Sequence, residues 1–400
     1  MGSSTTLIGD RRRQALERSA AISRHPAHRR RTTRSSAPPP VEFYLIAVVM
    51  AVFVMLGLVM VLSASSISQL HQGNSPWRVF SKQAMWAVFG TIGLWIAMRV
   101  PLHFWRRLVT PFLVGAMALM VLPFAGGVGA EVNGAKAWVA IGPFTFQPSE
   151  FLKLAVLLFC ADLLTRRRTE MNDPRRTLVP VMGVAVVGAG LCLLQSDLGS
   201  AIVIGCIVFV MAFVAGAPFV PMAGAGALGA LAAVGFVVSS PRRAARFTAF
   251  MDIAANKDHL SYQTYQAQIS IATGGLTGQG PARGSATLGG FLPLAHSDFI
   301  FAVIAQELGF VGVIGVLGGF VLLAYAGVQV ALASVDRFAS LVASGIVGWL
   351  VVQMIINVGG VTGMMPVTGL TLPFFSAGGS SLFVTMVAGG LLLNVARHVK

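Results

Sequence analysis

Charged residues are scarce in this sequence. Asp and Glu together number 14 in 400 residues, the four charged types make up 11%, and 55% of the residues are hydrophobic. Soluble domains carry about 25% charged residues, so the composition excludes an ordinary soluble fold and predicts that most of the chain lies in a bilayer. The three cysteines all fall in apolar runs without metal-ligand spacing. They therefore indicate neither a disulfide framework nor a cysteine metal site.

Long apolar runs are abundant. Runs of roughly 18 or more apolar residues indicate transmembrane helices. The candidates lie near residues 43–63, 80–98, 108–126, 149–165, 178–194, 198–215, 219–239, 299–330, 338–361 and 380–396. The expected fold is an all-α polytopic membrane protein with ten transmembrane helices, in one domain over residues 42–400. Residues 240–298 are predicted to form a large extracytoplasmic loop between helices 7 and 8, and residues 259–275 within it have the spacing of an amphipathic helix.

The positive charge is unevenly distributed. The net charge is +15, and most of the 29 Lys and Arg residues lie on one side of the membrane if the N-terminus is inside. Cytoplasmic loops carry such an excess, so we expect cytoplasmic N- and C-termini and no nucleic-acid partner. Residues 1–41 are rich in Arg and end in "APPP". They are predicted to be a disordered basic cytoplasmic tail that either contacts membrane lipid or a partner, or serves only as a topology anchor.

Two of the scarce acidic residues occur in the stretch "PLAHSDFIFAVIAQELGF", residues 293–310. Asp298 stands where a polar segment becomes apolar, and Glu307 lies inside the apolar run. Nine helical residues rise about 13.5 Å and end half a turn out of phase, so the two carboxylates do not form one site. Asp298 is either an acid that satisfies amides at a helix start or a general base at the membrane boundary. For Glu307, a structural pair with another helix is favoured over a functional role.

Other polar residues gather where the topology places the outer ends of helices. Glu150 and Lys153 are three residues apart and either form a local ion pair or leave Lys153 to bind an anion. The Gly/Ser turn before the last apolar run can present amides to an anion, whereas His296 is expected to be a solvated loop residue. The residues expected to bind a polar, membrane-anchored substrate are Lys136, Trp138, Lys153, Gln195, Asp197, Gln268, Gly378, Gly379, Ser380 and Ser381.

Six motifs occur in the order found in one known family. They are "NGAKAW", "FQPSEFLKL", "SDLGSA", "YQ…Q…GGLTGQG", "HSDFIFAVIAQELGF" and "PVTGLTLPFFSAGGSSL". Over residues 43–396 the chain resembles the SEDS family, named for shape, elongation, division and sporulation, which includes FtsW, RodA and SpoVE. The long basic tail favours a division-type member.

The resemblance implies a peptidoglycan glycosyltransferase that polymerises lipid II, a lipid-linked disaccharide-peptide, at the outer face of the bacterial plasma membrane. Its implied partners are a class B penicillin-binding protein, a transpeptidase, and other divisome or elongasome proteins. It assigns the general base to Asp298, and Lys136, Lys153 and the turn Gly378–Ser381 are candidates to stabilise the departing pyrophosphate. No dedicated metal cage is seen, and a Mg²⁺ or Mn²⁺ ion between phosphate and carboxylate stays open.

Two other classes of function compete with an enzyme. A lipid II flippase would need polar residues through the full membrane depth or an inverted repeat, and a non-catalytic scaffold for a penicillin-binding protein would not need Asp298. The polar residues concentrate on one side and no inverted repeat is evident. The sequence therefore favours the enzyme.

Overall fold

The computed structural model describes residues 38–125, 127–132, 135–142, 144–171, 173–284 and 292–399. The chain divides into residues 1–38 and residues 39–400, and every element below belongs to the second unit. The predicted disordered tail lies outside the described residues as far as residue 37. Its last residue, Val41, begins the first described helix.

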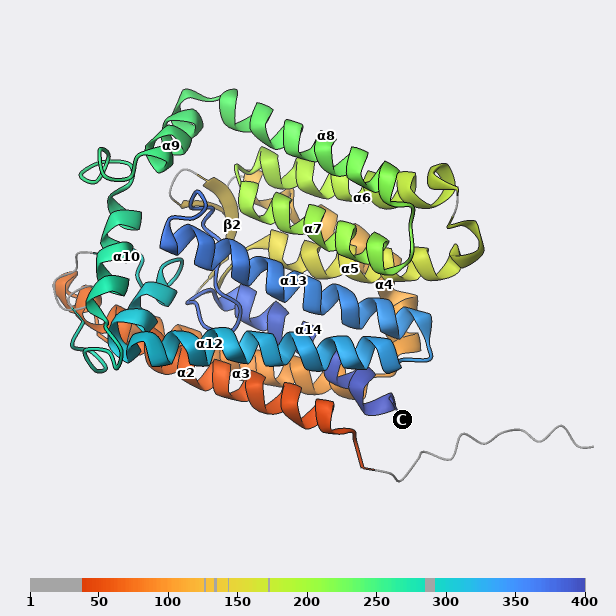
Figure 1. Cartoon of the computed structure of the whole chain (residues 1–400), viewed down its shortest axis with the longest axis horizontal. Coiled ribbons are helices and arrows are strands. Elements are labelled where there is room, and N and C mark those ends of the chain that lie inside the picture. The colour runs from red at the N-terminus through yellow and green to blue at the C-terminus, as the bar shows by residue number, and fades with distance from the viewer. Residues whose placement is uncertain are drawn as a thin grey trace, which may run out of the picture. The chain divides into compact units, whose positions relative to one another are not determined.

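Long helices make up most of the described chain (Figure 1). They are α2 (Val41–His71), α3 (Arg78–Arg99), α4 (Leu102–Leu119), α5 (Pro148–Arg166), α6 (Pro174–Leu194), α7 (Leu198–Val214), α8 (Phe219–Val238), α12 (Ile300–Ala333), α13 (Arg337–Thr362) and α14 (Gly379–His398). The shorter elements are η1 (Leu122–Phe124), β1 (Gly129–Val132), β2 (Ala135–Ile141), β3 (Phe144–Phe146), η2 (Arg168–Glu170), α9 (Pro241–Met251) and α10 (Tyr262–Thr273). Each long helix overlaps one of the predicted apolar runs, although the bounds differ, most clearly for α2 and α4.

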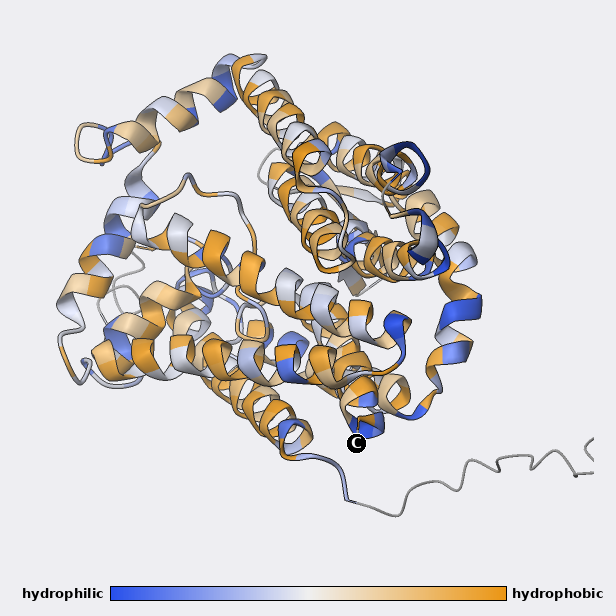
Figure 2. Cartoon of the chain, turned by 45° about the vertical axis from the view of Figure 1, so that its right-hand side comes forward, coloured by the Kyte–Doolittle hydropathy of each residue, from blue (hydrophilic) through white to orange (hydrophobic). Residues whose placement is uncertain are grey.

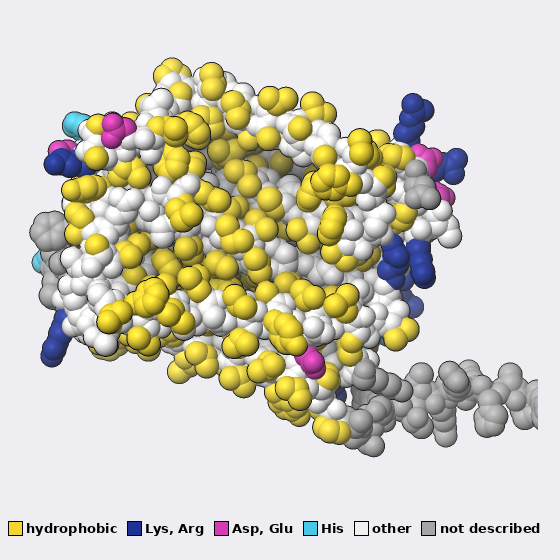
Figure 3. Space-filling model, in the orientation of Figure 1, with side chains coloured by type: hydrophobic (Ala, Val, Ile, Leu, Met, Phe, Trp, Pro, Cys, Tyr) yellow, Lys and Arg dark blue, Asp and Glu magenta, His cyan; other side chains and the backbone are white. Residues whose placement is uncertain are grey.

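The exposed surface of the helices is apolar, as a bilayer requires. Hydrophobic side chains cover the visible face of the long helices, and Lys and Arg side chains gather beyond the helix ends (Figure 3). The same apolar helices are seen from a second direction in Figure 2. Within the described residues, seven helices are long and apolar enough to cross a membrane, namely α2, α4 with η1, α6, α8, α12, α13 and α14. The all-α membrane class is confirmed, while the number of ten spans stays a prediction.

A small sheet interrupts the helices. The Gly-rich segment between η1 and α5 contains β1, β2 and β3 in one antiparallel sheet of that order. Ala137 and Val139 of β2 are buried, and Lys136 and Trp138 alternate with them. Because neighbouring strand residues point to opposite faces, Lys136 and Trp138 share one face of the sheet.

The long segment between α8 and α12 is partly ordered. It contains α9 and α10, and α10 confirms the helix predicted within residues 259–275. After α10 the backbone runs against α12: the amide of Gln279 donates to the carbonyl of Gln306 (2.9 Å), and the amide of Phe310 donates to that of Gly275 (2.9 Å). These bonds form where α12 is kinked at Gly309, whose φ of 67° favours glycine.

The core is built around α14, which is buried on almost every face and packs against α3, α2, α5 and α13. Helix α8, in contrast, buries Met222 alone among its described residues. The ends of α2 and α13 and the starts of α3, α5, α12 and α14 share one end of the bundle. The predicted polar residues lie at this end.

Candidate functional site

Asp298 lies two residues before α12 and is not its cap. The N-cap residue is Phe299, and the first turn of α12 receives no side-chain cap. Asp298 is instead held through its backbone, because Asn357 Nδ2 of α13 donates to the carbonyl of Asp298 (2.9 Å) and to that of Leu370 (2.7 Å). The helix-capping interpretation of Asp298 is therefore wrong, and its carboxylate is not used to begin the helix.

The side chain of Asp298 is partly buried. Burial raises the pKa of Asp298 from 3.8 to about 6, and a hydrogen bond from Ser297 acts in the opposite direction. A Cβ added to Gly369 would stand 3.8 Å from Oδ2, so the carboxylate lies beside that glycine. No described Lys, Arg or His forms an ion pair with Asp298. A carboxylate whose pKa is raised toward neutrality can accept a proton near pH 7.

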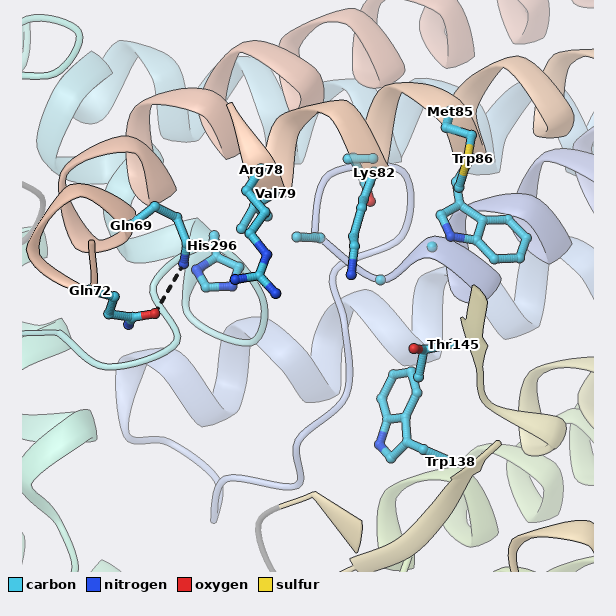
Figure 4. Close-up of a pocket in the computed structure, with 14 residues that line it drawn as sticks. Gln69, Gln72, Arg78, Val79, Lys82, Met85, Trp86, Trp138, Thr145 and His296 are labelled. Atoms are coloured by element: carbon cyan, nitrogen blue, oxygen red, sulfur yellow. Dashed lines mark hydrogen bonds between the residues drawn. The ribbon is translucent and has the colours of Figure 1, made fainter. Parts of the chain in front are cut away.

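A cavity of about 410 Å³ is lined by residues of α3, of the small sheet, of the segment that precedes α12 and of the Gly/Ser turn (Figure 4). Arg78 and Lys82 reach into it from α3, and Trp138 and Thr145 of the sheet face them from the other side. His296 lines it beside Arg78, and Asp298 follows His296 by two residues, which places their Cα atoms at most about 7.6 Å apart. Asp298 does not itself line the cavity, and residues 296–298 connect the acid to the cavity wall.

His296 departs from its expected role as a solvated loop residue. It is partly buried, and desolvation lowers the pKa of its imidazole, which favours the neutral ring. Its carbonyl accepts a hydrogen bond from the amide of Ala377 (2.8 Å). This bond joins the segment that carries Asp298 to the Gly/Ser turn before α14.

The Gly/Ser turn forms one wall of the cavity through Gly378 and Gly379. A Cβ on Gly379 would overlap the indole ring of Trp86, so the close approach of the turn to α3 requires glycine here. The hydroxyl of Ser380 accepts from the amide of Gln147 (3.0 Å), and Ser381 shares a hydrogen bond with Thr371 (2.8 Å). The two glycines thus face the cavity, while the two serines fasten the turn to its neighbours.

Glu150 and Lys153 form the local ion pair that the sequence left open. Lys153 Nζ lies 2.7 Å from Glu150 Oε2 and donates to Gln353 Oε1 (3.0 Å), and both charged side chains are buried. Gln353 Nε2 in turn donates to the carbonyl of Thr371 (2.9 Å). The pair therefore ties α5 and α13 to the segment that leads into the Gly/Ser turn, and substrate binding by Lys153 stays a prediction.

Three further predicted substrate ligands are hydrogen-bonded within the protein. Asp197 caps α7 by accepting from the amide of Ser200 (2.9 Å) and also accepts from Gln147 Nε2 (2.8 Å). Gln195 Nε2 donates to the carbonyl of Met120 (2.6 Å) and is buried. Gln268 Nε2 of α10 donates to the carbonyl at the end of α13, that of Thr362 (3.1 Å). These contacts give each residue a structural role, and a substrate role stays a prediction.

Lys136 and Glu307 differ in their exposure and in their contacts. Lys136 is exposed on β2, on the same face as the cavity residue Trp138. Glu307 is buried and accepts hydrogen bonds from Ser63 Oγ of α2 at 2.6 and 2.8 Å. The same hydroxyl accepts from the amide of Ala282 (3.0 Å). Glu307 therefore has the structural pairing expected of it, with a hydroxyl group on another helix.

Comparison with known proteins places the chain in a family. The sequence model described as "Cell cycle protein", for FtsW, RodA and SpoVE, matches residues 43–400. The chain belongs to this family. A probable peptidoglycan glycosyltransferase FtsW of Mycobacterium bovis is 37% identical over 89% of this chain and 68% of its own length. The stage V sporulation protein E of Bacillus subtilis is 35% identical over 88% of this chain and 96% of its own.

Solved structures give the same result. A chain of a peptidoglycan synthase complex, described for the coordination of polymerization and crosslinking, superposes with a TM-score of 0.74 at 32% identity, covering 88% of this chain and 97% of that one. The rod shape determining protein RodA of Thermus thermophilus superposes with a TM-score of 0.65 at 31% identity, over 89% and 97% of the two chains. The chain thus shares the multi-pass membrane fold of these relatives.

The sequence analysis missed three residues at this family member's site. Arg78 and Lys82 were not singled out, although two cations at the predicted outer start of a helix run against the usual charge distribution. Asn357 was also missed, and an Asn inside a long apolar run is a polar residue that needs a partner. The unusual position of two cations at an outer helix end could have indicated Arg78 and Lys82. The sequence around Asn357, in contrast, contains no signal that its partner is Asp298.

Proposed function

We propose that this chain, a peptidoglycan glycosyltransferase of the FtsW/RodA/SpoVE family, polymerises lipid II into glycan strands with Asp298 as general base. The observation that carries the proposal is the partly buried Asp298 carboxylate, whose pKa burial raises to about 6, two residues from His296 in the wall of a cavity that Arg78 and Lys82 also line. A base of this pKa is ionised at pH 7 and still accepts a proton as the reaction proceeds. The family relationship supplies the class of reaction.

The reaction requires one proton transfer and one leaving group. The 4-hydroxyl of one sugar attacks the anomeric carbon of another, and a new carbon–oxygen bond forms. The bond between that carbon and the diphosphate oxygen breaks, and the electron pair leaves with the diphosphate on its lipid. Asp298 takes the hydroxyl proton. Asn357 donates a hydrogen bond to the backbone carbonyl of Asp298 and so positions the residue that carries the carboxylate.

We also propose that the site faces the outside of a bacterial plasma membrane and that both termini are cytoplasmic. The charged residues at the opposite end of the bundle support this orientation. Arg106 and Arg166 both pair with Asp162 there, at 2.6 and 2.7 Å, and the Arg-rich segment 166–176 joins α5 to α6 at that end. Such an excess of basic residues is typical of cytoplasmic loops.

A class B penicillin-binding protein is the partner we propose. The reason is that one structural neighbour is a chain of a peptidoglycan synthase complex that polymerises and crosslinks. Polymer strands become a wall only when a transpeptidase joins them, so a polymerase of this kind gains from a bound crosslinking enzyme. Division is the setting favoured by the basic tail, and other divisome or elongasome proteins would complete the assembly.

The sequence left open a divalent cation between phosphate and carboxylate. Within the described residues, no group of three or more His, Cys, Asp or Glu side chains could hold a metal ion. A Mg²⁺ or Mn²⁺ ion at Asp298 would need the phosphates of the substrate as further ligands. Polymerisation measured with each metal and with a chelator tests this directly.

The proposal is tested with purified protein in liposomes that contain lipid II, with the candidate penicillin-binding protein added. Glycan strands separated on a gel are expected from wild type and not from folded Asp298→Ala protein. Asp258→Ala is the matched control, because Asp258 is an exposed acid in the segment between α8 and α12, and it should polymerise normally. Equal polymer from wild type and Asp298→Ala would refute the base. No polymer from any variant would favour a flippase or scaffold, and lipid II flipping would then be measured in the same liposomes.

A further inference from the structure

A group of arginines at the end of the bundle opposite the cavity carries more positive charge than the acids around it balance. Figure 3 shows Lys and Arg side chains gathered beyond this end of the helices. Asp162 pairs with both Arg106 and Arg166, at 2.6 and 2.7 Å, so its charge is already shared between two cations. Neither Arg168 nor Arg337 forms an ion pair with a described residue.

The other acids at this end are engaged elsewhere. Asp336 caps α13 by accepting a hydrogen bond from the amide of Phe338 (3.1 Å). Glu170 and Asp173 lie 4.0 and 3.5 Å from the guanidinium of Arg176. Among the described residues, none of these acids pairs with the two unpaired arginines. The positive charge of those arginines is therefore available to an anion from outside the chain.

Arg337, the first residue of α13, is held in place without being neutralised. Its Nη2 donates to the carbonyl of Ala215 (2.7 Å), whereas its Nε is buried and has no hydrogen-bond partner in the described chain. Arg168, exposed in η2, lies close enough for its charge to act on Arg337. Two like charges repel each other. An anion bound by both guanidinium groups converts this repulsion into attraction.

Apolar side chains are exposed beside the two arginines. Ala215, which Arg337 contacts, lies in the turn between α7 and α8. Phe213 before this turn and Phe219 and Val220 after it are exposed. Such helix ends lie within a bilayer, which places the neighbouring arginines at the depth of the lipid headgroups. A ligand with an anionic head and an apolar tail fits this surface better than a soluble acidic protein does.

We propose that Arg168 and Arg337 bind the phosphate of an acidic phospholipid whose acyl chains lie along the adjoining ends of α7 and α8. A guanidinium presents a planar fork of donors that matches the oxygens of a phosphate. A headgroup of net negative charge balances the two cations, whereas a zwitterionic headgroup does not. Under the orientation proposed above, this lipid belongs to the inner leaflet. The site depends neither on Asp298 nor on the polymerase function.

Binding of fluorescent phosphatidylglycerol to the full chain in a nonionic detergent tests the site. Arg168→Gln removes an exposed cation, so it should unfold at the wild-type temperature without lipid and bind the lipid about fivefold more weakly. Arg337→Gln should weaken binding at least as much, and Arg337→Lys, which keeps the charge, should bind more tightly than Arg337→Gln. Arg397→Gln is the matched control, because it removes an exposed cation in the last turn of α14, and it should not change binding. The Arg-rich segment 1–37 is the same in every variant, so its contribution cancels.

Competition with unlabelled molecules decides what the site binds. Phosphatidylglycerol should displace the labelled lipid from wild type, and phosphatidylcholine, which has a phosphate but no net charge, should displace it poorly. Unchanged binding in Arg168→Gln and Arg337→Gln would overturn the site. An equal loss in Arg397→Gln would also overturn it, because basic residues would then act only through their summed field. Displacement by inorganic phosphate at the concentration of the competing lipid would replace the lipid by a free anion. Displacement by a polyglutamate peptide at that concentration would assign the surface to an acidic protein instead.

Discussion

Replacing Asp298 by Asn is expected to abolish polymerisation and at the same time to stabilise the protein. Burial raises the pKa of Asp298 from 3.8 to about 6, so the folded protein binds this proton more tightly than the unfolded chain does. The contribution of Asp298 to the free energy of unfolding is therefore fully present below pH 4 and is lost as the pH rises to 6. A shift of about two pKa units corresponds to at most about 3 kcal/mol. Asn stays neutral and avoids this loss.

Thermal unfolding in detergent between pH 4 and pH 7.5 measures the effect. The difference in unfolding temperature between Asp298→Asn and wild type should be small at pH 4, increase up to pH 6 and then stay constant. Asp258→Asn, at an exposed position, should show no such change between pH 4 and 6. A stabilisation that is equal at every pH, or absent at pH 7.5, would show that the carboxylate is not desolvated as the structure indicates.

The polymerisation rate of wild type should depend on the same ionisation. Ionisation of Asp298 lowers the stability of the protein but raises the rate. A base with a pKa of about 6 is nearly all ionised at pH 7.5 and about one-tenth ionised at pH 5, so the rate should fall about tenfold over that range. A rate that is constant from pH 7.5 to pH 5 would refute Asp298 as the base.

Three further substitutions test the packing around the site. Asn357→Leu should lower the polymerisation rate at least about tenfold, because two backbone carbonyls lose their donor; a rate equal to wild type would exclude a positioning role. Lys153→Met should lower the free energy of unfolding by about 3–5 kcal/mol, since Glu150 keeps a buried charge without its cation, and adding Glu150→Gln should recover most of that loss. If the double variant is no more stable than the single one, the ion pair is not the cause. Gly309→Ala places a side chain at a φ of 67° and against the backbone of Gly278, so it should cost at least about 1–3 kcal/mol, and an unchanged unfolding temperature would contradict this.

The helices were predictable because their signal is local. An apolar run long enough to cross a bilayer indicates a helix whatever its neighbours are, and runs such as 149–165 and 338–361 correspond to α5 and α13. The ion pair of Glu150 and Lys153 was also open to prediction, since three residues on a helix bring the two side chains together. The strands β1 to β3 were missed because short strands in a Gly-rich segment have little periodicity.

The sequence by itself determined that most of this protein lies in a bilayer and where its long helices are, and the family resemblance predicted a role for Asp298. Only the tertiary structure decided what surrounds that acid. Asn357 reaches the carbonyl of Asp298 across 59 residues of sequence, and α3 brings Arg78 and Lys82 to the cavity that His296 and Gly378 complete. Composition and periodicity act within one helix, whereas a site made by several helices depends on which faces pack together. That choice follows from the contacts of the whole bundle, among them the close approach of Gly379 to Trp86.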